Sequence, residues 1–507
     1  MPTTTRPHPL LIQGGMGVAV SGWELARAVA GRGQLGVVSG TALDAVLARR
    51  LQLGDPGGHM RRALAAFPVP EAAAYVLDRY FVEGGVAPGE RMRAVARLRV
   101  ERGADAELLT VMGNFVEVWL AKEGHDGLVG VNYLAKIQVA TPPALFGAIL
   151  AGVDYVLVGA GIPGPIPALA SRLARAEPVT TLVTVEGDEE PLPHVFDPRG
   201  GVMAQLPDGC GPLRRPDVLA IVSLPVLASY LVRDPATRPD GFVIETHRAG
   251  GHSAPPRGKL ALDGGGEPVY GPRDHPDLAK VAALGIPFWL AGGAAHPERL
   301  AEARAMGAVG VQLGSAFALC QESGLRDELR TELRQRARAG TLRVRNDPRA
   351  SPTAFPFKVA ELPGTLSDDT VRAARRPVCD LGYLRTPARA ANGGLVYRCA
   401  AEPVAAYVRK GGAAVDTAGR MCLCNGLLAT VGLGQRRPGG TAEPPVVTLG
   451  QDLGFLADLS PEGRPYSAAR VIDWMTGAEA LPQPPPAAQV IARLTGANAS
   501  AQTPRTR

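Results

Sequence analysis

The chain has few aromatic residues, few cysteines and no long apolar run. Phe, Trp and Tyr make up 5% of its 507 residues, and Cys occurs six times. No apolar run reaches the roughly 18 residues that a membrane span needs, and the apolar run in the opening MPTTTRPHPLLIQGG is too short for a signal-peptide core. We therefore expect a cytoplasmic protein with no disulfide framework and no membrane partner.

A block of basic residues interleaved with aromatic residues is also absent. The net charge is +6, from 54 Lys and Arg against 48 Asp and Glu. The basic residues are mostly arginines scattered along helical patterns such as 299–307 and 329–340. This distribution argues against a nucleic-acid footprint and leaves a small-molecule substrate as the expected partner.

What the chain does have is a regular alternation of short apolar runs and helical patterns. The runs are continuous rather than alternating, which is typical of parallel strands covered by helices, and their number matches a (β/α)8 TIM barrel. The predicted strands are 10–13, 35–39, 128–134, 154–161, 218–223, 241–246, 287–293 and 310–315. The alternative is an open doubly wound sheet, but no GxGxxG follows the first run, as a dinucleotide-binding fold would require.

The barrel is expected over 9–338, in an α/β fold with additions. A helical insertion is expected at about 55–125 and a hairpin insertion with a Gly/Pro-rich tip at about 180–206. Residues 339–480 read as a C-terminal accessory region that holds four cysteines. Residues 481–507 read as a proline-rich linker and a disordered tail.

Glycines gather where the last two predicted strands end. AGGAAHPERL (291–300) follows the seventh strand and opens a helix, and LGSAFAL (313–319) follows the eighth. In a TIM barrel these loops carry function, and exposed backbone N–H groups at a helix start bind phosphate. A Gly pair also marks an ordinary tight turn. The coincidence of both loops predicts a site for a cofactor phosphate.

The ends of the first and third predicted strands supply candidate residues for binding a planar ring. Gln13, Gly14, Gly15 and Met16 end the first strand, and Asn132 in GVNYL lies at the end of the third. A carboxamide can both donate to and accept from the edge of a flavin ring. The alternatives are a tight turn with Met16 in the core, and Asn132 as a helix cap.

The candidate catalytic residue is His252 in IETHRAGGHSAPPRG, residues 244–258. A histidine can exchange a proton near neutral pH, and this one follows a strand and a Gly pair. His247 is the less favoured candidate because it lies closer to the strand. A lone histidine is also a common structural hydrogen-bond donor.

Together these pieces resemble the FMN-dependent nitronate monooxygenases, formerly called 2-nitropropane dioxygenases. Flavin-type enoyl-ACP reductases, including the separate enoyl reductases of polyketide and polyunsaturated fatty-acid synthases, share their barrel. The similarity covers roughly residues 9–330. It rests on IQGGMG, GVNYL, VDYVLVGAGIP, ETHRAGGHSAPPRG and FWLAGGAAHPERLAEARAMGAVGVQLGSAF, in that order.

The resemblance implies a flavin-dependent oxidoreductase that binds FMN, with His252 as its active-site residue. The implied cofactor-binding residues are Gln13, Gly14, Gly15, Met16, Asn132, Gly250, Gly251, Ala291, Gly292, Gly293, Gln312, Gly314 and Ser315. The implied reaction is the oxidation of alkyl nitronates by O₂ to a carbonyl compound and nitrite. The alternative is NAD(P)H-dependent reduction of enoyl thioesters, with an acyl carrier protein or synthase as partner. A barrel that binds FMN without catalysis is a third option, and the oligomeric state, with a homodimer as one possibility, stays open.

The chain differs from this family in three segments, and these differences make the substrate less certain to carry over than the cofactor. They are the helical insertion, the long segment 255–274 after His252, which could lid the substrate pocket, and the C-terminal region. The four cysteines of that region are Cys379, Cys399, Cys422 and Cys424. Their number suits a zinc or iron–sulfur site. However, no C-x₂-C pair occurs and buried cysteine is common in cores, so we include no metal ligand among the site residues.

Overall fold

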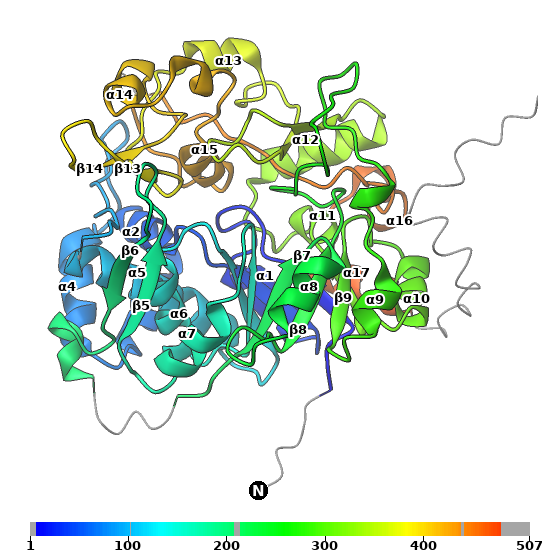
Figure 1. Ribbon diagram of the computed structural model, residues 1–507, viewed down its shortest axis with the longest axis horizontal. Helices are drawn as coiled ribbons and strands as arrows, with labels where there is room; N and C mark the ends of the chain where they lie inside the picture. The colour runs from blue at the N-terminus through cyan, green and yellow to red at the C-terminus, as the bar shows by residue number, and fades with distance from the viewer. Residues whose placement is uncertain (1–6, 102, 207–212, 438–440, 478–507) are drawn as a thin grey trace, which may run out of the picture.

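Eight parallel strands close into a barrel (Figure 1). The computed structural model describes residues 7–101, 103–206, 213–437 and 441–477; the expected linker and tail at 481–507 lie outside them. β10 pairs with β1 and thereby closes the ring. The barrel strands are β1 (Leu11–Gln13), β2 (Leu35–Ser39), β3 (Val129–Leu134), β4 (Tyr155–Gly159), β7 (Asp217–Val222), β8 (Gly241–Glu245), β9 (Phe288–Ala291) and β10 (Gly310–Leu313). The predicted (β/α)8 fold is confirmed, and each strand falls within or close to its predicted run.

The interior of the barrel is filled by large apolar side chains from its strands. Leu157, Val243 and Trp289 are fully buried there. The Trp289 indole Nε1–H donates to the carbonyl oxygen of Pro9 at 2.8 Å, so the one polar atom of this ring has a partner. The barrel is therefore a packed core, and its ligands must bind at the ends of the strands.

Helices surround the barrel because each has an apolar stripe that faces the strands. α1 (Trp23–Ala30), for example, buries Leu25, Ala26 and Val29 and leaves Glu24 exposed. The other helices that follow strands are α6 (Thr141–Leu150), α7 (Ile166–Leu173), α8 (Pro225–Leu231), α9 (Leu278–Ala282), α10 (Pro297–Ala305) and α11 (Ser315–Ala318). Among the described residues, no helix is both long enough and apolar enough to cross a membrane.

The segment between β2 and β3 is largely helical. It contains α2 (Leu43–Gln52), α3 (His59–Ala65), α4 (Pro70–Tyr80) and α5 (Ala104–Lys122). α5 packs against α1, α6, β2 and β3. It therefore occupies the place between α1 and α6 in the ring of helices around the barrel. The insertion relative to a simple β/α repeat consists of α2, α3, α4 and the stretch before α5.

A two-stranded hairpin lies between α7 and β7, in the segment where the sequence suggested an insertion at about 180–206. β5 (Val179–Val183) pairs antiparallel with β6 (Leu192–Phe196). Its tip meets the C-terminal region, where Glu186 bridges to Ala388 and Asp188 forms an ion pair with Arg389 at 2.7 Å.

The C-terminal region lies over the carboxyl end of the barrel, at the top of Figure 1, and also closes its helical ring. α17 (Ala468–Thr476) packs against both α1 and α10, the place where the eighth outer helix of a barrel belongs. The remaining helices and strands are α12 (Asp327–Arg338), β11 (Val344–Asp347), β12 (Phe357–Ala360), α13 (Asp369–Ala374), β13 (Thr386–Arg389), β14 (Leu395–Arg398), α14 (Val404–Arg409), α15 (Leu423–Thr430) and α16 (Leu456–Leu459). This region is thus part of the barrel's own packing.

Barrel closure predicts that Gly310→Ala is strongly destabilising. A Cβ at Gly310 would lie 1.8 Å from the carbonyl oxygen of Leu10, and that oxygen accepts a closing hydrogen bond from Val311 N–H. We expect a loss of about 2 kcal/mol or more in the free energy of unfolding, as for other overpacked sites, measured by urea denaturation. The control Gly264→Ala meets no atom within 4 Å and should change little. Equal stability of the two variants would show that the barrel is not closed at this pair of strands.

Candidate active site

Two adjoining cavities lie at the carboxyl end of the barrel. The first, which we call the glycine chamber, is lined by the loops after β1, β8, β9 and β10. It includes most of the predicted cofactor residues, namely Gly14, Gly15, Met16, Gly250, Gly251, Ala291, Gly292, Gly293, Gln312, Gly314 and Ser315. Residues 448–450, Asp452 and Phe455 complete its wall, a contribution that the sequence analysis did not foresee.

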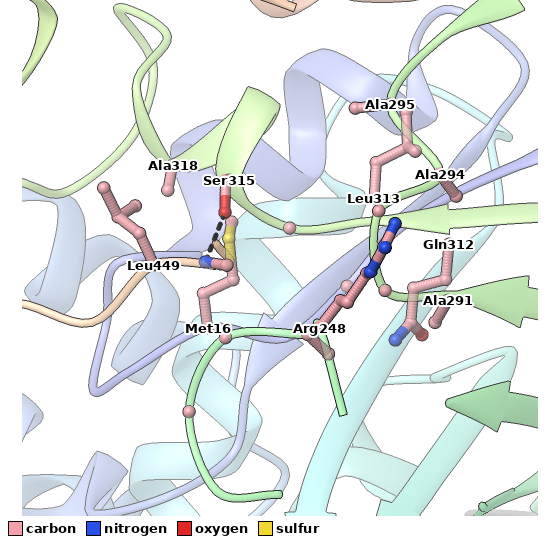
Figure 2. A pocket seen from close by; sticks show the side chains of 18 of the residues that line it. Met16, Arg248, Ala291, Ala294, Ala295, Gln312, Leu313, Ser315, Ala318 and Leu449 are labelled. Atoms are coloured by element: carbon pink, nitrogen blue, oxygen red, sulfur yellow. Dashed lines mark hydrogen bonds between the residues drawn. The ribbon is translucent and has the colours of Figure 1, made fainter. Parts of the chain in front are cut away.

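Backbone forms one side of the glycine chamber. Gly292 and Gly293 have φ of +91° and +75°, a left-handed conformation that disfavours any side chain. A Cβ at Gly292 would lie 2.3 Å from Thr246 Oγ1, whereas a Cβ at Gly314 would meet only Met16, at 3.7 Å or more. The Ser315 Oγ accepts a hydrogen bond from Gly450 N–H at 2.7 Å (Figure 2). The two loops after β9 and β10 therefore present main chain to an open space.

Two side chains of the chamber have polar groups to offer a ligand. The Gln312 Oε1 is buried and has no hydrogen-bond partner in the described part of the chain. Arg248 lines the same chamber (Figure 2), and no described carboxylate lies within ion-pair distance of it. Asp452, the nearby acid, faces His296 Nε2 at 3.7 Å. Arg248 was not predicted as a site residue, because no motif in the sequence distinguishes it from its neighbours His247 and Ala249.

Gln13 requires a correction. Its side chain is fully buried and lines neither cavity. The Gln13 Nε2 donates to the carbonyl oxygens of Gly14 and Val37, and its Oε1 accepts from Val37 N–H at 3.1 Å. Both ends of the carboxamide are therefore engaged within the barrel, and the Gln13 side chain links β1 to β2.

The second cavity, the histidine chamber, holds the predicted catalytic residue. His252, Asn132, Ile221, Phe357 and Tyr383 contribute to its lining. The Asn132 Nδ2 donates to the carbonyl oxygen of Leu157 at 3.0 Å. A Cβ at Gly15 would lie 2.7 Å from Asn132 Oδ1. The structure therefore brings the ends of β1 and β3 together, as the ring-binding prediction requires.

His252 is held by the C-terminal region. The His252 Nε2 lies 2.7 Å from Ser351 Oγ and 3.4 Å from Thr353 Oγ1, and its ring packs edge-on against Phe357 at 4.9 Å. Burial, and next to it the positive charge of Lys136, lowers the pKa of His252 to about 3. The imidazole is therefore neutral at physiological pH and can accept or donate a hydrogen bond without carrying charge.

Glu245 lies between the two chambers and lines both. Burial raises the pKa of its carboxyl group to about 7, although Lys358 opposes the shift. Lys358 comes from β12, is fully buried, and donates from Nζ to the carbonyl oxygen of His247 at 2.5 Å. Burial lowers the pKa of Lys358 to about 8. Neither residue stands out in the sequence, because Glu245 reads as the end of a strand and Lys358 lies in the C-terminal region.

His247 packs outside both chambers. Its ring stacks on Tyr270 with the centroids 4.1 Å apart, and burial lowers its pKa to about 4. Tyr270 belongs to the long segment after His252, so this segment is fastened beside the loop. The structure thus gives His247 a packing role.

The four cysteines of the C-terminal region form no disulfide, and Cys424 lines the histidine chamber. Cys379, Cys399 and Cys422 lie in one small apolar cluster. In the part of the chain that the structure describes, no group of three or more His, Cys, Asp or Glu residues is arranged to hold a metal ion.

Comparison with solved structures finds similar folds at low identity. No family model and no curated protein matches the chain. FabK from Thermotoga maritima is 16% identical with a TM-score of 0.45, covering 97% of this chain and 96% of that one. Nitroalkane oxidase from Streptomyces ansochromogenes is 15% identical with a TM-score of 0.45, covering 96% and 97%. The enoyl reductase domain of MlnA from the Bacillus amyloliquefaciens macrolactin cluster is 12% identical with a TM-score of 0.37, covering 72% and 67%.

The environment of the histidines predicts their titration. His252 should stay neutral between pH 5 and pH 8, because burial disfavours its protonated form, so its ring NMR signals should not move over that range. His296 is the control, since the hydrogen bond to Asp452 raises its pKa and its signals should titrate above the usual midpoint. Histidine-selective labelling with assignment by substitution measures both. A His252 midpoint near 6.5 would contradict the burial described here.

Proposed function

We propose that the protein is an FMN-dependent oxidoreductase whose cofactor occupies the glycine chamber and whose substrate occupies the histidine chamber. The observation that supports this most directly is that the two chambers adjoin. Gly15, Gly17, Glu245, Gly250, Gly251 and Thr448 line both of them. A group bound by its phosphate in the first chamber can therefore present a ring to the second.

The residues of the glycine chamber fit FMN. The loops that carry Gly292, Gly293, Gly314 and Ser315 line the chamber with main chain, and backbone N–H groups at such loops suit a phosphate. Arg248 adds a positive charge to the lining of the chamber. The unpartnered Gln312 Oε1 is an acceptor that needs a donor, since a buried polar atom left without a hydrogen bond is costly.

Bound FMN would supply the electron transfer that the side chains cannot, because none of them accepts a hydride. The chain's own groups then handle orientation and protons. His252, neutral and fixed at Nε2 by Ser351, can hold the substrate by a hydrogen bond at Nδ1. The Glu245 carboxyl group, with a pKa of about 7, can give up or take a proton at neutral pH.

Two reactions fit this arrangement. Nitronate oxidation by O₂ is the one that the sequence resemblance puts first. The reduction of an enoyl thioester by NAD(P)H is favoured by one feature of the structure: the histidine chamber is roofed by C-terminal residues such as Leu384, Leu423 and Leu427 and continues beyond Tyr383 into further cavities. A small nitroalkane anion needs no such extension, whereas a long acyl chain or its carrier does.

Anaerobic mixing of the purified protein distinguishes the two reactions. Bleaching of the flavin absorbance by NADPH, followed by reoxidation with crotonyl thioester, supports the reductase. Bleaching by ethyl nitronate but not by NADPH supports the nitronate reaction. A protein that carries no flavin and takes up none would overturn both.

Gly293→Val should abolish FMN binding. The valine side chain would project into the space beside the backbone N–H groups, on a backbone with φ of +75°. Gly285→Val is the matched control, since Gly285 has φ of +66° and no atom within 4 Å of the added Cβ. We expect flavin content, measured by absorbance after denaturation, to be lost only from Gly293→Val. A flavin-replete Gly293→Val protein would place the phosphate elsewhere.

His252→Asn should retain FMN but lower turnover by about 100-fold, as expected for the loss of a proton-handling or orienting group. The comparison is His247→Asn, which alters a ring outside both chambers and should keep most of the activity. Steady-state rates and flavin content are measured together on both variants. Full activity of His252→Asn would remove this residue from the mechanism.

A further inference from the structure

Two hydroxyl groups join His252 to a cation. The His252 Nε2 lies 2.7 Å from Ser351 Oγ, which lies 2.8 Å from Thr353 Oγ1. Thr353 Oγ1 in turn accepts a hydrogen bond from Lys136 Nζ at 3.3 Å. Lys136 belongs to the loop after β3, whereas Ser351 and Thr353 lie between β11 and β12 in the C-terminal region. The candidate catalytic residue therefore shares one hydrogen-bond chain with a lysine that is distant in the sequence.

Lys136 is a cation without a paired acid. Its Nζ lies 4.6 Å from the centroid of the Phe355 ring, a cation–π contact. Among the described residues no carboxylate forms an ion pair with it. Asp44 lines the same cavity but accepts a hydrogen bond from Tyr383 OH at 2.5 Å. Burial lowers the pKa of Lys136 to about 8, so the group is mostly charged at pH 7, and an ammonium group donates hydrogen bonds but accepts none.

The loop that carries the two hydroxyl groups is held in place. Ser351 is fully buried. The Arg420 Nη1 donates to the carbonyl oxygen of Ser351 at 2.6 Å and to that of Arg349 at 3.0 Å. Ala354 N–H donates to the carbonyl oxygen of Ser351 at 3.2 Å, which closes a turn around Thr353. The positions of both hydroxyl oxygens are therefore set by main chain that is itself hydrogen-bonded.

The donors and acceptors of this chain fit in one direction. Thr353 N–H also donates to Ser351 Oγ at 3.2 Å. If the Ser351 hydroxyl donates to His252 Nε2 and the Thr353 hydroxyl donates to Ser351, every group has a partner. In the reverse direction His252 Nε2 would carry the proton, and the Thr353 hydroxyl would have no acceptor in the described part of the chain. Because an unpaired donor is costly where water is excluded, Nε2 is the unprotonated nitrogen of the neutral ring. The positive charge of Lys136 acts in the same sense, since it disfavours a further proton on His252.

The other ring nitrogen of His252, Nδ1, faces the histidine chamber. It has no hydrogen-bond partner among the described residues, yet it is not one of the polar atoms that are buried without a partner. The ring is part of the chamber lining, so Nδ1 reaches the open space. A neutral imidazole that accepts at Nε2 carries its proton on Nδ1. The chamber is therefore offered a hydrogen-bond donor.

We infer that Lys136 is a positioning residue which, through Thr353 and Ser351, keeps the proton of the neutral His252 ring on Nδ1 and so makes His252 a hydrogen-bond donor to the substrate. The inference deepens the proposed function and rests on it for the place of the substrate. It specifies that the substrate atom beside His252 is an acceptor, such as an oxygen that carries or gains negative charge. Both proposed reactions offer such an oxygen.

Nitrogen NMR of the imidazole tests the position of the proton without turnover. The purified protein, labelled at histidine, is measured at pH 7, and the His252 signals are assigned by their loss in His252→Asn. The nitrogen chemical shift separates a ring nitrogen that carries a proton from one with a free lone pair. We expect the proton of His252 on Nδ1. A proton on Nε2 would overturn the inference.

Substitutions test the part played by Lys136. Lys136→Glu replaces a donor by an acceptor of opposite charge, so the chain should reverse and His252 Nε2 should gain a proton. Lys136→Arg keeps a cation that only donates and should leave the proton on Nδ1. Arg238→Glu is the control, an equal change of charge on an exposed residue in the segment before β8, at the amino end of the barrel, and should change nothing. An unchanged His252 signal in folded Lys136→Glu contradicts the role given to Lys136.

Thr353→Val serves if a thermal melt shows that the charge reversal unfolds the protein. It keeps the shape of the side chain but removes the hydroxyl group that links Lys136 to Ser351. Ser351 Oγ then has a free acceptor position and can accept from the ring as well as donate to it. We expect the His252 Nε2 signal to move away from the position of a free lone pair. A signal that stays in place in folded Thr353→Val would also refute the inference.

Activity separates this inference from the proposed function. If either proposed reaction occurs, Lys136→Glu should lower kcat by about tenfold or more, the worth of one hydrogen bond, with unchanged flavin content, and Lys136→Arg should retain most of the rate. Wild-type kcat in Lys136→Glu would count against the inference. If the His252 signals respond as expected but neither ethyl nitronate nor crotonyl thioester is turned over, the positioning of His252 by Lys136 stands and the proposed reactions fail.

Discussion

The site depends on the close approach of two backbones at Gly250. A Cβ there would lie 2.9 Å from the carbonyl carbon of Leu449, so only glycine lets the loop after β8 contact the C-terminal segment 448–450. Hydrogen bonds fasten the contact: Gly251 N–H donates to Thr448 Oγ1 at 2.8 Å, and Lys358 N–H donates to Gly251 O at 2.9 Å. This contact forms the wall between the two chambers and fixes His252, the next residue along the loop.

The C-terminal region is therefore part of both the barrel and the site. α17 fills the ring position between α10 and α1, Lys358 lies beneath the loop that carries His252, and Tyr383 stands where the cavities adjoin. A barrel that ended after α12 would lack an outer helix, one wall of the glycine chamber and the roof of the histidine chamber. The C-terminal region lines the histidine chamber together with the barrel loops.

The barrel and most of the glycine chamber were predictable from the sequence because both depend on local patterns. Apolar runs of strand length mark β1 to β10, and Gly pairs mark the turns where backbone is exposed. Gln13 shows the limit of this reasoning. Its position at the end of β1 is consistent either with binding a cofactor or with a hydrogen bond to a neighbouring strand, and only its contacts with Val37 distinguish the two roles. Arg248, Glu245 and Lys358 could not be found, since their roles come from contacts between segments distant in the chain.

The central claim is that one bound flavin joins the two chambers, and a crystal structure of the protein purified with its chromophore tests this most directly. The account predicts FMN with its phosphate between the Gly292–Gly293 turn and the start of α11, and with its ring beside Asn132 and His252. A phosphate bound elsewhere, a ring directed away from His252, or a glycine chamber filled by side chains would contradict it.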